Sequence, residues 1–140
     1  MNTGIATDQN CIEVFGKMKM EKSLSYVIFK IDETAEHIVV EKEGAKGESY
    51  ESFLGCFPDK SARFGVFDYH YTNEEEGRQI SKIVFVFWCA PGTKMQDKFK
   101  YASAQTELKS KLQGVSLSYE ARNLSDIDAK EVVDKDMSKF

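Results

Sequence analysis

The sequence predicts a single domain of the α/β (α+β) class over residues 1–140, with helices on both faces of a mixed, mostly antiparallel sheet of five to six strands. The first reason is the order of elements, since two strand hairpins and a later strand are separated by helical segments. The second is that segments 25–31 and 82–88 are apolar on both faces, which indicates strands covered on two sides. The third is size, because 140 residues with 41% hydrophobic content suit one domain with a sizeable core.

Hydrophobic periodicity and turn residues place the elements along the chain. Ser49 is a suitable N-cap for a short helix, and Asp128 with Glu131 can cap the last one. The strand after the long helix is reached by a helical crossover, so we expect it to run parallel to the strand before. In chain order we expect a flexible tail (1–7), a helix with Cys11, Val14, Phe15 and Met18 on its apolar face, and a hairpin of strands 25–31 and 37–41. A short helix that carries Tyr50, Phe53 and Leu54 and stops near Pro58 follows. After it we expect a hairpin of strands 63–71 and 82–88, the long helix, a strand at 115–120 and the last helix.

The long helix is predicted between Thr93 and Gly114. Pro91 and Gly92 break the apolar run that precedes it. Thr93 followed by Gln96 fits a capping box, and Gly114 suits the left-handed residue that follows many helices. The helix would be roughly 27 Å long, because each residue adds about 1.5 Å.

The long helix carries two apolar stripes that face different directions, because residues three and four apart share a face. One stripe lies in its C-terminal half and consists of Tyr101, Ala104, Leu108 and Leu112. The other lies in its N-terminal half, among lysines 94, 98 and 100, and consists of Met95, Phe99 and Ala102. An apolar anchor within a charged rim is typical of a protein-binding surface. The alternative is that both stripes belong to the core and the helix bends between them.

Composition argues against several classes of function. The net charge of −4 disfavours a general nucleic-acid binder. No signal-peptide pattern begins the chain, and no apolar run approaches the roughly 20 residues of a membrane-spanning helix. Cys11, Cys56 and Cys89 are far apart, so we expect reduced thiols in a cytosolic protein, with neither a metal site nor a disulfide.

Catalytic motifs are not evident in this sequence. It contains no glycine-rich phosphate loop, no nucleophile elbow and no helical His/Glu metal pattern. The one enzymatic alternative is a hydrolase in which Cys89 is activated by His70 on an adjacent strand. Binding is better supported, because Arg78 and Lys82 can form an exposed basic patch, although such cations also serve simply to keep edge strands soluble.

Six segments, taken together, carry a resemblance that covers essentially the whole chain. They are Thr3-Gly4-Ile5-Ala6, Tyr50-Glu51-Ser52-Phe53-Leu54 before a proline, Phe67-Asp68-Tyr69, Ser81-Lys82-Ile83-Val84-Phe85, Trp88 with Pro91, and Lys98-Phe99-Lys100-Tyr101-Ala102-Ser103. In this order and spacing the chain resembles the ADF/cofilin family of actin-depolymerising proteins. The resemblance implies the ADF-homology, gelsolin-like fold and an actin-binding protein that is neither an enzyme nor dependent on a cofactor.

The resemblance also implies how the protein acts. Family members bind monomeric and filamentous actin, prefer the ADP form, and promote filament depolymerisation and severing. One surface, formed by the N-terminal tail, the front of the long helix and the turn before the last helix, binds the actin monomer and one subunit of a filament. A second surface, formed by the turn between the third and fourth strands and by the last helix, touches the neighbouring filament subunit. The alternative with the same fold is a monomer sequesterer or a coactosin-like filament binder with weak or no severing.

Carried over to this sequence, the monomer surface comprises Thr3, Gly4, Ile5, Lys94, Gln96, Lys98 and Phe99. Phe99 stands where the family usually has Met, and it keeps the apolar character. Gln96 stands where the family has Arg or Lys, so a charge-assisted hydrogen bond worth about 1.5–3 kcal/mol is lost if it was well formed. The filament surface comprises Arg78, Lys82, Asp134 and Lys135. There Ile80 replaces a typical basic residue, and Arg78 is the nearest substitute.

Regulation is implied at two places. Thr3 occupies the position of the family's regulatory serine, where a phosphate would add about −1.5 to −2 charge beside Lys98 and repel a carboxylate-rich partner. Phosphoinositide headgroups compete with actin in the family, and Lys98, Lys109 and Lys111 are the candidates here. The basic nuclear-import run of some relatives is interrupted, so we expect a cytoplasmic monomer at the actin cytoskeleton that binds no nucleic acid.

Overall fold

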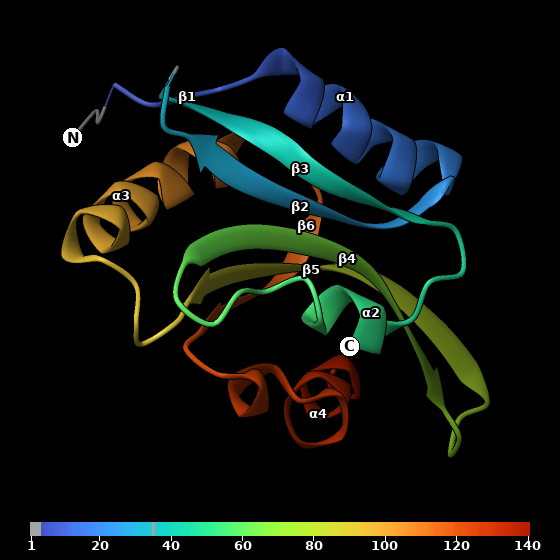
Figure 1. The fold of residues 1–140 in the computed structure, drawn as a ribbon. Coiled ribbons are helices and arrows are strands. Elements are labelled where there is room, and N and C mark those ends of the chain that lie inside the picture. The colour runs from blue at the N-terminus through green and yellow to red at the C-terminus, as the bar shows by residue number, and fades with distance from the viewer. Residues whose placement is uncertain (1–3, 35) are drawn as a thin grey trace.

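In the computed structural model, which describes residues 4–34 and 36–140, one six-stranded sheet lies between two layers of helices (Figure 1). The strand order across the sheet is β1-β3-β2-β4-β5-β6. In chain order the elements are β1 (Ala6–Thr7), α1 (Gln9–Gly16), the π-helical turn η1 (Lys17–Glu21), β2 (Leu24–Asp32), β3 (His37–Ala45), α2 (Tyr50–Leu54), β4 (Ala62–Asn73), β5 (Arg78–Cys89), α3 (Met95–Lys111), β6 (Val115–Ala121), the 3-10 turn η2 (Leu124–Ile127), the π-helical turn η3 (Ala129–Val133) and α4 (Asp134–Met137).

The pairing of the strands confirms a mixed, mostly antiparallel sheet. β2 pairs antiparallel with β3 and β4, and β4 pairs antiparallel with β5. The long helix α3 carries the chain back across the sheet, so β6 runs parallel to β5, as predicted. The other parallel pair joins β1 to β3 at the opposite edge.

Each face of the sheet has its own hydrophobic core, which confirms helices on both faces. Neighbouring strand residues point to opposite faces, so Val27 and Phe29 join one core while Tyr26 and Ile28 join the other. The first core lies under α1 and α3 and includes Cys11, Phe15, Phe64, Phe85 and Leu108. The second lies under α2 and α4 and includes Phe53, Trp88, Ile127, Val133 and Met137. Burying each large apolar side chain stabilises the fold by about 1.5–3 kcal/mol.

The flexible tail expected over residues 1–7 is wrong for residues 5–7. Ile5 is buried in the first core, and Ala6 and Thr7 pair with His37 and Ile38 of β3. A two-residue strand gives no periodic signal in the sequence, and the segment is held because the edge of β3 offers unpaired backbone groups. Thr3 lies outside the described residues.

The hairpin of β4 and β5 extends further than the sequence predicted. Its ladder runs from the Ala62–Cys89 pair to the Asn73–Arg78 pair. β2 pairs with β4 only as far as Phe67, and β6 pairs with β5 only from Ile83. The end of the hairpin therefore projects from the sheet as a two-stranded ribbon, at the lower right of Figure 1.

The caps of the helices follow the sequence in part. The Ser49 hydroxyl accepts a hydrogen bond from the Ser52 N–H, and Asp128 accepts one from the Glu131 N–H, as expected of N-caps. Gly114 has the predicted left-handed backbone, with φ of 104°. None of the helices in residues 4–34 and 36–140 has the length and apolarity that crossing a bilayer requires.

Candidate functional site

The rotation of α3 about its own axis is set by the stripe in its C-terminal half. Tyr101, Ala104 and Leu108 are buried in the first core, and Leu112 follows them just after the helix. The Tyr101 hydroxyl accepts a hydrogen bond from the Ile31 N–H at 3.0 Å. These contacts hold one side of α3 against the sheet, so its other side faces outward.

The outward side of α3 carries the second stripe, as predicted. Phe99 is 67% exposed and Met95 is 64% exposed, so two large apolar side chains stand in solvent on neighbouring turns. The alternative in which both stripes are core is therefore wrong. Large apolar groups exposed together at neighbouring positions are characteristic of an interaction surface.

Cations and a polar amide surround these apolar side chains. Lys94 and Gln96 are exposed, and Lys98 is half-buried. Within the described part of the chain, neither Lys94 nor Lys98 has an acidic partner, whereas Lys100 lies 3.8 Å from Glu36. Lys94 and Lys98 are therefore available to carboxylates of another protein.

The start of α3 differs from the capping box that the sequence suggested. The helix begins at Met95 with Lys94 as its cap residue, and no side chain caps it. The buried Thr93 hydroxyl has no hydrogen-bond partner among the described residues. Because the helix starts one residue late for Thr93 to act as its cap, Gln96 lies in the first turn and its side chain is exposed.

The N-terminal segment lies beside α3, as the resemblance implied (Figure 1). Gly4 is exposed, with a φ of 80° that side-chain-bearing residues rarely adopt. Ile5 instead directs its side chain into the first core. Of the three N-terminal residues expected at the monomer surface, Gly4 therefore offers surface, Ile5 anchors the segment, and Thr3 is outside the described residues.

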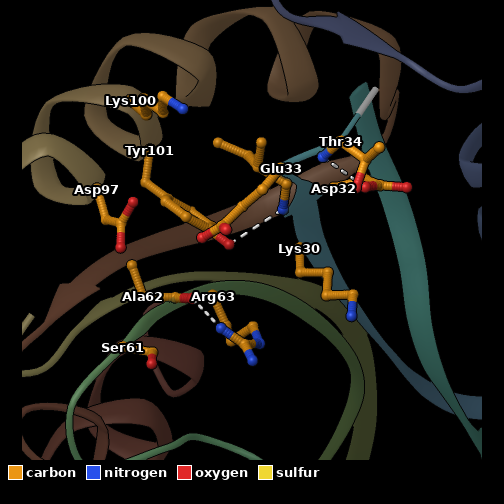
Figure 2. A pocket seen from close by; sticks show the side chains of 11 residues that line it. Lys30, Asp32, Glu33, Thr34, Ser61, Ala62, Arg63, Asp97, Lys100 and Tyr101 are labelled. Atoms are coloured by element: carbon orange, nitrogen blue, oxygen red, sulfur yellow. Dashed lines mark hydrogen bonds between the residues drawn. The ribbon is translucent and has the colours of Figure 1, made fainter. Parts of the chain in front are cut away.

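A polar hollow of about 340 Å³ lies at the front end of α3, between this helix, the end of β2 and the start of β4. Figure 2 shows Tyr101 reaching from α3 toward the strand, with Asp97 and Lys100 beside it on the helix. Arg63 on the other wall donates to both oxygens of Glu41, at 2.8 and 3.2 Å. With this cation paired in the protein, we interpret the hollow as polar support for the first turns of α3.

The expected filament surface is arranged differently, because its three cations already have contacts within the protein. The Arg78 guanidinium donates to the backbone oxygen of Phe140 at 2.6 Å and lies 3.2 Å from a Glu76 oxygen. The Lys82 ammonium lies 4.9 Å from the centre of the Phe140 ring, within cation–π range. Phe140, which is 42% exposed, thus brings the two predicted residues Arg78 and Lys82 together.

The remaining residues of the filament surface lie on α4. The Asp134 carboxylate accepts a hydrogen bond from the Tyr69 hydroxyl at 2.7 Å, which keeps it half-buried. Lys135 is exposed and lies 3.3 Å from Glu131 one turn earlier. Ile80 is buried in the second core, so this position contributes no side chain to the surface.

The three candidate phosphoinositide lysines are not gathered at one place. Lys98 and Lys109 lie eleven residues apart on α3, which is about 16 Å along the helix. The Lys109 ammonium donates to the Ser118 hydroxyl at 2.9 Å and lies 5.6 Å from the centre of the Phe85 ring. Lys111 is exposed at the far end of the helix. A single headgroup therefore cannot contact all three.

The hydrolase alternative is wrong, because its two residues lie at opposite ends of the hairpin. Cys89 pairs with Ala62 and His70 pairs with Ser81. Ala62 and His70 are eight residues apart on one strand, or about 27 Å.

Cys11 is buried and its thiol donates to the Ile38 carbonyl; burial raises the pKa of this thiol to about 12. Among the described residues, no three His, Cys, Asp or Glu side chains are grouped to hold a metal ion.

Known proteins resemble this chain over nearly its whole length. The family model of cofilin/tropomyosin-type actin-binding proteins matches residues 4–137. The chain belongs to this family. It is 33% identical over 127 residues to actin-depolymerizing factor 11 of Oryza sativa subsp. japonica, covering 91% of this chain and 87% of that protein. It is 31% identical over 133 residues to a cofilin of Yarrowia lipolytica, covering 95% of this chain and 86% of that protein.

Solved structures of the cofilin family have the same fold. The cofilin of Streptomyces griseoflavus superposes with a TM-score of 0.84 at 30% identity, covering 94% of this chain and 96% of that one. A coactosin of Entamoeba histolytica superposes with a TM-score of 0.82 over 99% of this chain and 97% of that one, but at 16% identity it shows the fold alone. The predicted fold class is thus confirmed, and so is the resemblance to the ADF/cofilin family.

Sequence reasoning did not single out Phe140, which contacts two residues of the expected filament surface. Its contacts with Arg78 and Lys82 join positions about 60 residues apart, and no local pattern links them. The only available signal was a large aromatic residue directly after a short polar helix, where nothing in the sequence required it to be buried.

Proposed function

We propose that this protein binds actin monomers and filaments and promotes filament depolymerisation and severing. The observation that carries the proposal is the exposed pair Phe99 and Met95 beside Lys94 and Lys98, on the front of α3, in a chain of the actin-binding cofilin family. The relatives named actin-depolymerizing factor and cofilin support the direction of the activity.

The monomer surface would bind by burying its apolar side chains in a groove of actin. Removing a Phe or Met side chain from water contributes about 1.5–3 kcal/mol each. Lys98 would add a charge-assisted hydrogen bond to a carboxylate at the rim of that groove. Because the backbone of α3 is held by the sheet, little ordering of the helix is needed on binding.

The filament surface would contact a neighbouring actin subunit through Arg78, Lys82 and Lys135. If these contacts fit one filament twist better than another, binding shifts filaments toward that twist. The contacts between actin subunits are then strained and break more easily. Severing depends on this second surface as well as on the first.

Filament pelleting together with real-time microscopy of single filaments tests the proposal. We expect the protein to move actin from the pellet to the supernatant and to raise the number of breaks per filament length. Unchanged pelleting and unchanged breakage, with no binding to monomers, would show that the proposed function is wrong.

A second candidate function, a monomer sequesterer or a coactosin-like filament binder, is favoured by two observations at the filament surface. Ile80 is buried where a cation is typical, and Arg78 and Lys82 already contact the backbone oxygen and the ring of Phe140. Binding to ADP-actin monomers without faster filament breakage identifies the sequesterer, whereas co-pelleting without breakage identifies the coactosin-like binder.

The finer points of partner choice and regulation belong to the same proposal. We infer a preference for ADP-actin, which a titration against ADP- and ATP-actin monomers measures directly. We also infer that the protein acts as a monomer at the cytoplasmic actin cytoskeleton, without a cofactor, catalysis or nucleic-acid binding.

Two modulators would act at the monomer surface. A phosphate on Thr3 would add negative charge that repels a carboxylate-rich partner and weakens actin binding, which a Thr3→Asp variant mimics. Phosphoinositide headgroups would compete with actin at Lys98, while Lys109 and Lys111 would meet a membrane separately. Vesicles with and without phosphoinositide, added to the monomer titration, show whether competition occurs.

A further inference from the structure

A larger hollow, of about 760 Å³, lies where β4 runs on beyond its last pair with β2. Its volume is within the roughly 300–1,000 Å³ of small-molecule sites. The residues that line it come from the start of β2, the loop before α2, α2 itself, β4 and the turn before α4. Of the described residues, none that is predicted at the two actin surfaces lines it.

Three aromatic rings form one wall of this hollow. Tyr50 stands edge-on to Phe67 and to Tyr69, with ring centres 5.1 Å apart in both pairs. The Tyr50 hydroxyl donates to the Ile127 carbonyl at 2.8 Å, and the Tyr69 hydroxyl donates to Asp134. Both hydroxyls are satisfied within the protein, and the three residues are largely buried, so each ring meets the hollow through the 5–7% of its residue surface that stays exposed.

Carboxylates outnumber ammonium groups around the same hollow. Glu48, Glu51 and Asp68 line it, against Lys22 and Lys46. The Asp68 side chain is only 8% exposed, accepts a hydrogen bond from the Ser81 hydroxyl at 2.9 Å, and lies 3.6 Å from the Lys22 ammonium and 3.5 Å from His70 Nε2. Lys22 is thus already paired with Asp68, while Glu51, which follows Tyr50 in α2, is exposed.

Carboxylates outside the lining of the hollow also act on the aromatic wall. Burial raises the pKa of the Tyr50 hydroxyl, and the charges of Asp128, Asp134 and Glu51 raise it further because they disfavour a phenolate. The pKa of Tyr69 is raised by burial, by its hydrogen bond to Asp134 and by Glu51. The carboxylates that act on these two rings would equally favour a bound cation.

We propose that this hollow binds an organic cation, such as a quaternary ammonium ion or the ammonium or guanidinium group of a basic side chain. Aromatic faces attract such cations through their quadrupole, and carboxylates add direct charge attraction. The cation would lie against Tyr50 and Phe67 with Glu51 nearby, away from the Lys22–Asp68 pair. Its source is either a free small molecule or a side chain of another protein, and both share this chemistry.

Titration of the labelled protein with choline, followed by amide NMR, tests the proposal. We expect saturable shifts at Gly47, Glu51 and the Phe67–His70 segment, with a dissociation constant in the millimolar range. Glu51→Gln removes a carboxylate from the rim and should weaken binding about three- to tenfold, whereas Lys46→Gln removes a competing cation and should strengthen it about twofold. Both positions are charged and at least partly solvent-exposed, so neither change should unfold the protein.

Two controls isolate the cation. Glu13→Gln removes the same charge from α1, on the other face of the sheet, and should leave choline binding unchanged. The neutral isostere of choline, with a tert-butyl group in place of trimethylammonium, should bind at least tenfold more weakly if charge attraction contributes about 1.4 kcal/mol.

The outcomes divide cleanly. Binding of choline that is tighter than binding of Nα-acetyl-lysine amide and Nα-acetyl-arginine amide, whose side chains stay charged, indicates a small-molecule site. The reverse order indicates a partner's basic side chain. Equal binding of the neutral isostere, shifts that do not saturate, or saturable binding of inorganic phosphate at the same amides would overturn the proposal. Binding is read directly on this chain, so the result is independent of whether the protein acts on actin.

Discussion

The two expected actin surfaces differ in what their charged side chains do before any partner arrives. At the front of α3, Phe99 is exposed and Lys98 has no acidic partner in the described part of the chain. At the hairpin and α4, Arg78 and Lys82 contact Phe140, and Asp134 is held by Tyr69. The first surface is open for binding, whereas the second is largely satisfied by its own neighbours.

This difference bears on the free energy of binding. A side chain without internal contacts gives its full interaction to a partner, minus the entropy of ordering it. A side chain that must first leave a hydrogen bond or an aromatic ring gives only the difference between the old and the new contact. We therefore expect the front of α3 to dominate monomer affinity, and the hairpin and α4 to tune filament binding with smaller steps.

The strongest test of this comparison is the double change Lys98→Ala and Phe99→Ala. Losing an exposed aromatic anchor and its cation should weaken monomer affinity about 30-fold, or ~2 kcal/mol, with a thermal midpoint close to that of the unchanged protein. Titration of labelled actin monomers and a thermal melt measure the two effects.

A buried residue of the same helix provides the contrast for that test. Leu108→Ala should destabilise the fold by about 2–5 kcal/mol, because it leaves a cavity in the first core. If the Lys98 and Phe99 double change lowered stability as much as Leu108→Ala, the assignment of Phe99 to an interface would be wrong.

A gain at the same surface should follow from Gln96→Arg. This change restores the cation that the family carries in the first turn, where Gln96 is exposed, and should tighten monomer binding up to about tenfold. Gln113→Arg adds the same charge beyond the far end of α3 and is the matched control. Equal tightening by both changes would mean that only net charge, and not position, governs binding.

At the filament surface, the double change Arg78→Ala and Lys82→Ala should weaken filament co-pelleting about fivefold and leave monomer affinity unchanged. The effect is expected to be smaller because exposed ion pairs contribute only about 0.2–1 kcal/mol each. Monomer affinity that fell in step with co-pelleting would contradict the division into two surfaces.

The smallest effect is expected for Phe140→Ala, which removes the ring beside Lys82 and keeps the backbone oxygen that accepts from Arg78. Lys82 would no longer have to leave the ring, a contact worth about 0.5–1 kcal/mol at an exposed site, so filament binding should tighten about two- to threefold. Co-pelleting isotherms measure this change. A loss of binding would instead mean that the Phe140 ring itself contacts the filament.

Much of the architecture was predictable because it depends on local periodicity. The alternation of Val27 and Phe29 with Tyr26 and Ile28 predicted a strand covered on both faces, and the structure confirms two cores. The crossover by α3 predicted that β6 is parallel to β5. Helix ends were predicted less well, because Thr93 and Gln96 fit a capping box in the sequence but the helix starts one residue too late to use it.

The site was predictable where it follows from the face of a single helix. Phe99 and Tyr101 are two residues apart and about 200° apart around α3, so packing of one face on the sheet exposes the other. The sequence alone therefore determined the fold class and the family, because each rests on spacing within segments or on motifs in order. It also placed Phe99 and Tyr101 on different faces of α3, but the exposure of the Phe99 face was decided by how the helix packs on the sheet.

Only the tertiary structure decided what those side chains contact. The sequence could not show that Ile5 enters the core, that Phe140 covers Lys82, or that Tyr50, Phe67 and Asp68 line one hollow. Each of these contacts joins positions more than 15 residues apart or depends on a strand too short to have a period. Such contacts are set by how whole elements pack against each other, and no local rule of spacing encodes them.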